Sequence, residues 1–495
     1  MLTILTEINL QKTIENVIGS VERLKELVEI KLIKSVTESL NKTLFVTNGS
    51  INSSFDWNDT EPPYLIPSIP FSNENLLALV FYKLGNHQKS FEFISEEDAL
   101  YDHLLIATHM QFGYEISDSM LAFTNSSSKH NFCVVQQYGK LLKPLNVNLL
   151  KKAFKDAIAD SREDENRFFT IKHFVNFLID YNYLSEAENI LRISIPNAIS
   201  HLSKNSLNAQ LASVLMAQLK LPYDTSVLDE IQNLQQDCIA YYESYNLKVN
   251  AGLLLVDASE IANFKGDFIS SKEYISKAIL YFKEEDIPEF LGEAGLRKAT
   301  LLYTWSKNGS PQYYKPAINA FQDVLKIFKR DTHPQKFAEI HHNLALIYSE
   351  IPVSEEEKPI WTAFSASSFK EVLAIYNKDR FPYEFAMASH NYATALMNFP
   401  KAKLHNNLDK AFGLFEDALS IRTVSKYPFE RALTLLNQLE LYWLMNNEDI
   451  EIEKKNFKEM VEKVSSISKL VNDKSILERA NHHIEKLKEL KIIIN

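Results

Sequence analysis

Two adjacent histidines, His341 and His342, lie in the apolar stretch FAEIHHNLALIY (Phe337–Tyr348) and are the first candidates for metal binding or proton transfer. Neighbouring side chains on a helix point about 100° apart, whereas two histidines that share one metal ion on a helix are usually four residues apart. His482 and His483 have the same unsuitable spacing, and the chain has no H-E-x-x-H motif. These histidines therefore predict no metal site.

The two cysteines, Cys133 and Cys238, are the next candidates for nucleophilic chemistry. Both lie in apolar, helix-like surroundings, which raise the pKa of a thiol and make it unreactive. Their separation offers no paired spacing, so a disulfide framework is excluded and the usage is typical of a reducing compartment. We expect two buried structural cysteines.

The remaining motifs of common enzymes are also missing. The sequence contains no G-x-S-x-G, no phosphate-binding P-loop and no G-x-G-x-x-G. Acidic runs at residues 284–289 and 354–358 fall at expected turns and helix starts, where the helix dipole favours solvated carboxylates. We therefore predict a protein that is not an enzyme and that needs no cofactor.

The composition of the chain indicates its fold class and the kind of partner it can bind. Hydrophobic residues make up 45% and charged residues 24%, as in ordinary globular proteins. Only 11 of 495 residues are glycine, against an average of about 7%, which favours helices joined by short turns over a sheet-rich fold. The net charge of −11 argues against nucleic-acid binding and mildly favours a protein or peptide partner.

The chain also gives no sign of export or membrane insertion. Its first residues, MLTILTEINLQKTIEN, have neither a basic segment followed by a long apolar core nor a cleavage site of small residues. No window of about 18 uninterrupted apolar residues occurs, so no membrane partner is expected. We predict a cytoplasmic protein.

Apolar residues recur at helical spacing through most of the chain, in segments that read as helix, tight turn and helix. Each turn has Gly or Asn where a helix ends in a left-handed conformation, and a small residue follows in the next helix, where two helices can approach closely. The turn residues are Gly85, Asn182 and Gly266, and the small residues that follow them are Ser90, Ala187 and Ser271.

A repeat is the strongest pattern in the sequence. Pro288, Pro334, Pro382 and Pro428 are separated by 46, 48 and 46 residues, and each is expected to begin a helix. The second helix of each unit keeps the same intervals, through Ile275, Phe321, Phe369 and Phe415. Two independent markers with one set of intervals define an internal repeat.

The first helices align as well, with Arg297, Asn343, Asn391 and Asn437 at one position and Ala299, Ala345, Ala393 and Leu439 two residues later. Proline boundary, helix pair and small residues together resemble the tetratricopeptide repeat, in a bacterial variant longer than the standard 34 residues. The resemblance covers roughly residues 240–445 and is weaker before that. It implies an all-α, right-handed superhelical α-solenoid of antiparallel helix pairs.

The expected organisation has four parts. Residues 1–75 are predicted to form N-terminal helices and a long proline-containing loop, 76–240 degenerate helical repeats, 241–448 the tetratricopeptide-like repeats, and 449–495 C-terminal capping helices. The loop at 46–75 contains Trp57, Tyr64, Ile66 and Phe71, which favour an ordered excursion packed on the array. The alternatives for this loop are that it acts as a lid or a partner-binding segment, or that it is disordered.

The resemblance implies a binding groove lined by the first helices. Aligned residue by residue, the groove positions are Arg297, Glu339, His342, Asn343, Met387, His390, Asn391 and Asn437. Asparagine suits the reading of a peptide backbone because it both donates and accepts hydrogen bonds. The alternative is that the repeated asparagine bonds between neighbouring helices and sets their spacing.

Three functions are compatible with these expectations. The first is a non-enzymatic scaffold or regulator that binds a protein or peptide through the concave face of the array. The second is a peptide-responsive sensor that regulates a partner enzyme, such as a protease or a defence effector. The third is an enzyme with a pocket between the N-terminal helices and the Trp57–Phe71 loop, for which no catalytic residues are evident.

Overall fold

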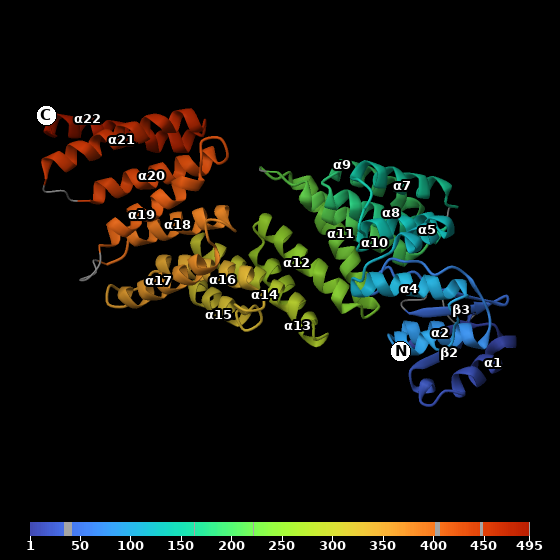
Figure 1. Ribbon diagram of the computed structural model, residues 1–495. Helices are drawn as coiled ribbons and strands as arrows, with labels where there is room; N and C mark the ends of the chain where they lie inside the picture. Colours follow the sequence, from blue (N-terminus) through green and yellow to red (C-terminus); the bar gives the residue numbers. More distant parts are fainter. Residues whose placement is uncertain (34–41, 163, 221, 401–405, 446–448, 495) are drawn as a thin grey trace. The chain divides into compact units, whose positions relative to one another are not determined.

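The computed structural model describes the chain except for residues 34–41, 163, 221, 401–405, 446–448 and 495 (Figure 1). It divides into two compact units, Met1–Ala278 and Ile279–Asn495. The division falls inside one helix, α13 (Phe268–Glu284). The first unit combines a small sheet with helices, and the second is built from helices in the part that the structure describes.

A five-stranded sheet opens the first unit. Its order is β2-β1-β3-β4-β5, with β1 parallel to both β2 and β3, and β4 antiparallel to β3 and β5. Helix α1 (Ile8–Gly19) and a 3-10 turn, η1 (Leu24–Glu26), connect β1 to β2. The strands are β1 (Leu2–Thr6), β2 (Val28–Leu32), β3 (Thr43–Thr47), β4 (Ser50–Ser53) and β5 (Ile69–Pro70).

This sheet corrects the prediction that helices and a loop make up residues 1–75. Leu2, Ile4 and Thr6 alternate along β1 and are fully buried, because this strand lies between two neighbours. Asn48 and Gly49, which join β3 to β4, both have positive φ, 48° and 74°. An Asn-Gly pair between two extended stretches is a strong hairpin signal, and it was the sequence feature that would have revealed the sheet.

The helices of the first unit follow the predicted turn chemistry. Gly85, Asn182 and Gly266 have φ values of 81°, 59° and 76°, so the predicted left-handed turns are confirmed. The helices are α2 (Asn73–Lys83), α3 (His87–Phe91), α4 (Ala99–Phe112), α5 (Asp118–Ser127), α6 (Lys129–Tyr138), α7 (Val147–Asp160), α8 (Glu165–Asp180), α9 (Leu184–Ser194), α10 (His201–Ala217), α11 (Thr225–Ser244) and α12 (Lys248–Phe264), with a 3-10 turn, η3 (Ile195–Asn197), after α9.

The small residues after these turns also lie where the sequence places them. Ser90, Ala187 and Ser271 have no exposed surface. The Ser90 hydroxyl donates to the Ala78 carbonyl across the α2–α3 pair at 2.7 Å. Ser271 donates in the same way to Ser259 across α12 and α13, also at 2.7 Å. The paired helices are therefore held close by a buried hydrogen bond as well as by packing.

The second unit is a stack of helix pairs. Pro288, Pro334, Pro382 and Pro428 each begin the first helix of a pair, as predicted. The described helices are α14 (Pro288–Lys307), α15 (Tyr314–Val324), α16 (Pro334–Glu350), α17 (Lys358–Ile375), α18 (Pro382–Met397), α19 (Asn407–Ile421), α20 (Pro428–Leu444), α21 (Ile450–Leu470) and α22 (Lys474–Ile494), with a 3-10 turn, η4 (Pro311–Tyr313), before α15.

The repeat markers form the core between the two helices of each pair. Phe321, Phe369 and Phe415 are fully buried. Four residues before each phenylalanine, the second helix has a fully buried small residue, and Ser365 there donates to Ala345 of the first helix at 2.8 Å. The described chain is thus a tetratricopeptide-like α-solenoid, as predicted, with the N-terminal sheet as an addition.

Candidate functional site

The first helices of the second unit form one continuous layer. Each of α14, α16, α18, α20 and α22 packs against the next, while successive second helices make sparser contacts with one another. We call this layer the first-helix face. All eight groove positions predicted from the sequence lie on these helices, on α14, α16, α18 and α20.

Hydrogen bonds cross this layer from repeat to repeat. Asn391 Nδ2 on α18 lies 2.8 Å from His342 Nε2 on α16. One repeat later, Asn437 Nδ2 on α20 lies 3.4 Å from His390 Nε2 and donates to Thr394 Oγ1 at 3.0 Å. We call the two histidine–asparagine pairs the His–Asn ladder, because each joins equivalent positions of successive first helices.

Burial keeps both histidines of the ladder neutral. It lowers the pKa of His342 to about 4. It lowers the pKa of His390 to about 3, with a smaller contribution from the positive charges of Arg422 and Arg479. A neutral imidazole has one nitrogen that accepts a hydrogen bond, and here that nitrogen faces the asparagine amide. The ladder is therefore a set of neutral hydrogen bonds.

This geometry is the interhelical alternative that the sequence left open. His342 is only 7% exposed, and its ring packs 6.0 Å from the ring of Phe369. His341, the other half of the pair, packs on Phe337 with ring centroids 4.3 Å apart. The two adjacent histidines therefore make different contacts: His342 bonds to the next repeat, and His341 packs within its own helix. Direct contact between the ladder and a peptide stays a prediction.

The other predicted groove residues reach the surface to different extents. Glu339 is exposed, while Asn343, Met387 and Arg297 are half-buried. Asn343 donates to the Glu339 carbonyl within its own helix, at 3.1 Å. The ladder has no rung between α14 and α16 because Leu296 stands on α14 at the position of His342 and His390, and leucine has no acceptor.

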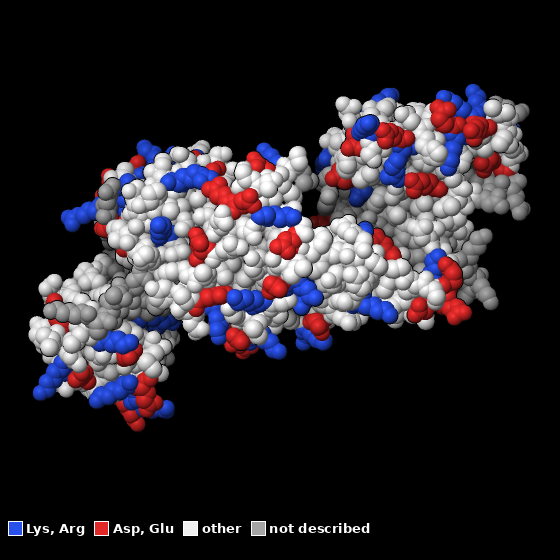
Figure 2. Space-filling view, turned by 180° about the vertical axis from the view of Figure 1, so that it is seen from behind, with Lys and Arg blue, Asp and Glu red and all other residues white. Residues whose placement is uncertain are grey.

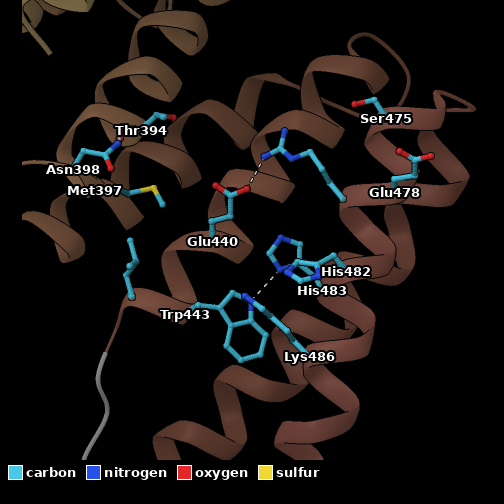
Figure 3. Close-up of a pocket in the computed structure, with 12 residues that line it drawn as sticks. Thr394, Met397, Asn398, Glu440, Trp443, Ser475, Glu478, His482, His483 and Lys486 are labelled. Atoms are coloured by element: carbon cyan, nitrogen blue, oxygen red, sulfur yellow. Dashed lines mark hydrogen bonds and ion pairs between the residues drawn. The ribbon is translucent and has the colours of Figure 1, made fainter. Parts of the chain in front are cut away.

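A pocket of about 720 Å³ lies on the first-helix face between α18, α20 and α22 (Figure 3). We call it the C-terminal pocket. It is lined by Thr394, Met397, Asn398, Glu440, Trp443, Leu444, Ser475, Glu478, Arg479, His482, His483 and Lys486. Helix α22 packs directly on α20, so it acts as one more first helix beyond the repeats found in the sequence.

The interior of the C-terminal pocket is fixed by hydrogen bonds. Trp443 Nε1 donates to His483 Nδ1 at 2.9 Å, and the two side chains point toward each other from α20 and α22 (Figure 3). Arg479 Nη2 lies 2.7 Å from Glu440 Oε1 and 3.2 Å from Asn437 Oδ1. The last contact connects the pocket to the His–Asn ladder.

The pocket offers an apolar surface beside mixed charges. Met397, Trp443 and the half-exposed Leu444 supply apolar area. Lys486 Nζ lies 5.7 Å from the centre of the Trp443 ring, within reach of a cation–π contact. Glu478 and His482 are exposed at the rim. Such a surface fits a segment with one apolar side chain flanked by polar or charged groups.

Sequence reasoning missed this pocket because it depends on α22. The repeat pattern ends near residue 445, and nothing in its period shows that His483 and Arg479 return to the first-helix layer. Trp443 was the available signal, since it lies six residues after Asn437 on the same first helix. A tryptophan there is unusual for a helix face that only packs against its neighbours.

The loop between β4 and β5 is ordered and packed, as predicted. Lys172 Nζ on α8 donates to the Trp57 carbonyl and to Asp59 Oδ1, both at 2.7 Å. Lys83 on α2 forms an ion pair with Glu61. Further polar contacts join His130 to the Pro63 carbonyl, Tyr64 to His103, and Asn131 to both backbone groups of Leu65.

Both cysteines are buried and free, and burial raises the pKa of each thiol to about 12, as expected for structural cysteines. Across the ranges that the structure describes, no three His, Cys, Asp or Glu side chains gather as a metal site. None of the described helices is both long and apolar enough to span a membrane. On the face shown in Figure 2, positive and negative side chains are interspersed.

Comparisons with known proteins give only distant structural alignments. No family model matches, and no curated protein matches. Among solved structures, a signal-transduction ATPase with a tetratricopeptide-repeat sensor from Pyrococcus horikoshii aligns at 13% identity and a TM-score of 0.49, covering all of this chain and 83% of that one. The Cut9–Hcn1 tetramer aligns at 12% and 0.29, over 84% and 80% of the two chains.

Yeast Tom70 aligns at 13% identity and a TM-score of 0.20, over 85% of this chain and 95% of that one. All three TM-scores lie below 0.5, so these alignments identify no partner. The surface residues of this chain therefore have to define its function.

Proposed function

We propose that this protein is a non-enzymatic interaction protein whose first-helix face binds a peptide segment of a partner, with the C-terminal pocket as the principal contact. The observation that carries the proposal is the pocket itself, in which Trp443, Met397 and Leu444 offer apolar area next to the fixed Arg479–Glu440 pair. Tryptophan and arginine are the residues that most often dominate the energy of an interface.

The rigidity of the surroundings supports this assignment. Trp443 is held by His483, and Arg479 is held from two sides, so little side-chain freedom is lost when a ligand binds. A preformed site has a smaller entropic cost of binding than one that must order itself. The His–Asn ladder adds to this because it fixes the spacing of α16, α18 and α20.

A second candidate is a sensor that regulates a partner enzyme, such as a protease or a defence effector. It is favoured by the path of hydrogen bonds that leads from Arg479 in the pocket to Asn437 and His390, and from Asn391 on the same helix to His342. A ligand that moves Arg479 would strain contacts two repeats away. Coupling of this kind requires two arrangements of the helices with different affinity for the ligand.

Selection of peptides from a displayed random library on the purified full-length chain tests the proposal. We expect selected peptides to share one apolar residue and to bind Trp443→Ala at least tenfold more weakly, a loss of about 1.4 kcal/mol that is typical of a truncated interface anchor. Titration with a labelled peptide, followed by fluorescence anisotropy, gives the affinities.

Trp361→Ala is the matched control for this experiment. Trp361 is also half-buried, but it lies on a second helix, α17, against Tyr348 and Phe364. The control variant should bind the selected peptides as tightly as the unmodified chain. If both variants bind with unchanged affinity, or if only the control loses binding, the C-terminal pocket is not the site.

A further inference from the structure

His483 lies in the C-terminal pocket and makes one contact that fixes its protonation state. It is 4% exposed, and its Nδ1 accepts the hydrogen bond from Trp443 Nε1 at 2.9 Å (Figure 3). The indole N–H of tryptophan can only donate, so Nδ1 must be the unprotonated nitrogen of the imidazole ring. The contact therefore exists only while His483 is neutral, with its proton on Nε2.

The surroundings of His483 also favour the neutral ring. Burial lowers its pKa below the ordinary value of 6.5. Among the described residues, the charged groups that act on it are Glu440 of α20, which raises the pKa, and three groups of α22, which lower it: Lys486, His482 and Arg479. Helices α18 and α21 contribute none of these charges. Because Arg479 Nη2 already engages Glu440 at 2.7 Å, that carboxylate is not free to stabilise an imidazolium.

Protonation of His483 would remove the hydrogen bond that holds Trp443. Both nitrogens of an imidazolium are donors, so no rotation of the ring offers the indole N–H an acceptor. The new charge would also lie on the same face of α22 as Arg479 and Lys486, four residues before it and three after it. Like charges at this spacing on a helix repel. Acid is therefore expected to release the Trp443 side chain from its fixed position.

We propose that His483 is the positioning residue of the C-terminal pocket, and that the pocket binds its peptide while His483 is neutral and releases it when His483 is protonated. The inference rests on the proposed function, in which Trp443 supplies the main apolar contact. A released side chain has to be ordered again on binding, and this ordering reduces the affinity. The peptide and the proton therefore compete for the same site.

This competition sets the direction and the size of the pH effect. Above pH 6.5 the ring of His483 is largely neutral, so the affinity for the peptide is full. The affinity falls as the pH drops through the folded-state pKa of His483, which lies below 6.5, and approaches a loss of about tenfold for each further pH unit. In return, a bound peptide lowers the pKa of His483 further, because the coupling is reciprocal.

Peptide titrations between pH 8 and pH 4.5 test the competition. The probe is a peptide selected on the full-length chain, with blocked ends, without His, Asp or Glu, and labelled with a dye whose emission does not depend on pH. We expect the dissociation constant to stay level down to pH 6.5 and to rise about tenfold below it. Circular dichroism at each pH checks that the chain is folded. A dissociation constant that stays level over the whole range overturns the proposal.

Substitutions identify the titrating group. His483→Asn retains an acceptor, because the asparagine Oδ1 is attached to the γ carbon as the histidine Nδ1 is, and it does not titrate. This variant should bind at pH 8 within about threefold of the unmodified chain and should lose the pH dependence. His483→Leu removes the acceptor and should bind about tenfold more weakly at every pH.

His482→Asn is the matched control, because it makes the same change at the exposed neighbour on the rim of the pocket. It should retain the pH profile of the unmodified chain. The proposal is overturned if the profile persists in His483→Asn, or if it is lost in His482→Asn instead.

A measurement without peptide separates this inference from the proposed function. Fluorine NMR of the chain labelled with 5-fluorotryptophan gives one signal for each of the four tryptophans, and Trp443→Phe identifies the signal of Trp443. This signal should move between pH 8 and pH 4.5 in the unmodified chain and stay fixed in His483→Asn. If it moves while peptide affinity stays level, the inference fails and the proposed function stands. If no selected peptide depends on Trp443, the proposed function fails and this inference fails with it.

Discussion

The two units hold their elements in place by different chemistry. In the first unit, two lysines of low exposure fix the loop between β4 and β5, with Lys83 paired to Glu61 and Lys172 to Asp59 and the Trp57 carbonyl. In the second unit, the neutral His–Asn ladder fixes the spacing of the first helices. A buried charge without its partner costs far more than a neutral group without its partner, so the two units should respond very differently to single substitutions.

The largest effect is expected at the charged contact of the first unit. Glu61→Ala leaves the Lys83 ammonium, whose side chain is 8% exposed, without a carboxylate. Breaking a buried ion pair in this way costs about 3–5 kcal/mol. Urea unfolding followed by circular dichroism, with proteolysis between β4 and β5 as a local probe, measures the change in the free energy of unfolding.

The double variant Glu61→Leu with Lys83→Met is the control for this prediction. It removes both charges and retains apolar volume, so it should recover most of the lost stability. Equal destabilisation by the single and double variants would mean that the ion pair does not hold the loop, and that packing of Trp57 and Tyr64 does.

Acidification should produce the next largest effect, through the His–Asn ladder. The folded-state pKa of His342, about 4, lies below its ordinary value of about 6.5. Between these values the unfolded chain binds a proton that the folded chain does not, so stability is fully present above pH 6.5 and is lost as the pH falls toward 4. The loss is on the order of 3 kcal/mol for this histidine.

Unfolding free energies at a series of pH values check this expectation. His342→Leu combined with Asn391→Leu removes the titrating group together with its partner, and its stability should fall less steeply between pH 6.5 and 4. His103 and His130 of the first unit also have pKa values lowered to about 4 by burial. Together with His390 of the ladder, whose pKa burial lowers to about 3, they supply the background slope that the variant should retain. An unchanged slope would contradict the assignment of His342 as a buried neutral group.

The smallest effect is expected for one rung of the ladder alone. Asn391→Leu leaves His342 Nε2 without its donor and should cost about 1–2 kcal/mol, the usual penalty for a buried neutral acceptor. Asn343→Leu is the matched control, because the Asn343 amide donates within its own helix, to the Glu339 carbonyl. It should cost less than about 0.5 kcal/mol. The difference between the free energies of unfolding of the two variants in urea measures how much the hydrogen bond between Asn391 and His342 contributes to stability.

The sequence predicted the repeats well because their determinants are local. A proline at the start of a helix, a glycine or asparagine at its end and a phenylalanine at a fixed spacing act within one helix pair. The 46- and 48-residue intervals then defined the positions of α14 to α20. The strand β1 was missed because it is defined by pairing with β2 and β3, up to 40 residues away, and five residues give little periodicity.

The candidate site was also predictable from the sequence only in part. The recurrence of His342 as His390, and of Asn343 as Asn391, was visible in the aligned helices. That His342 bonds to Asn391, 49 residues later, was not, because the contact depends on how far one repeat is shifted along the next. The C-terminal pocket requires α22, which lies beyond the repeats visible in the sequence, so the residues that line the pocket could be known only from the tertiary structure.

The His–Asn ladder has a consequence for how this array could gain or lose repeats. Each rung takes its acceptor from one repeat and its donor from the next, so no single repeat carries a complete rung. Excision of residues 382–427 would bring Asn437 opposite His342 and leave a complete rung. Excision of residues 334–381 would bring Asn391 opposite Leu296, where Asn343 stands in the intact chain, and would keep the rung between His390 and Asn437. Each excision therefore removes one rung and leaves one complete, so by this bond either repeat can be lost at a similar cost.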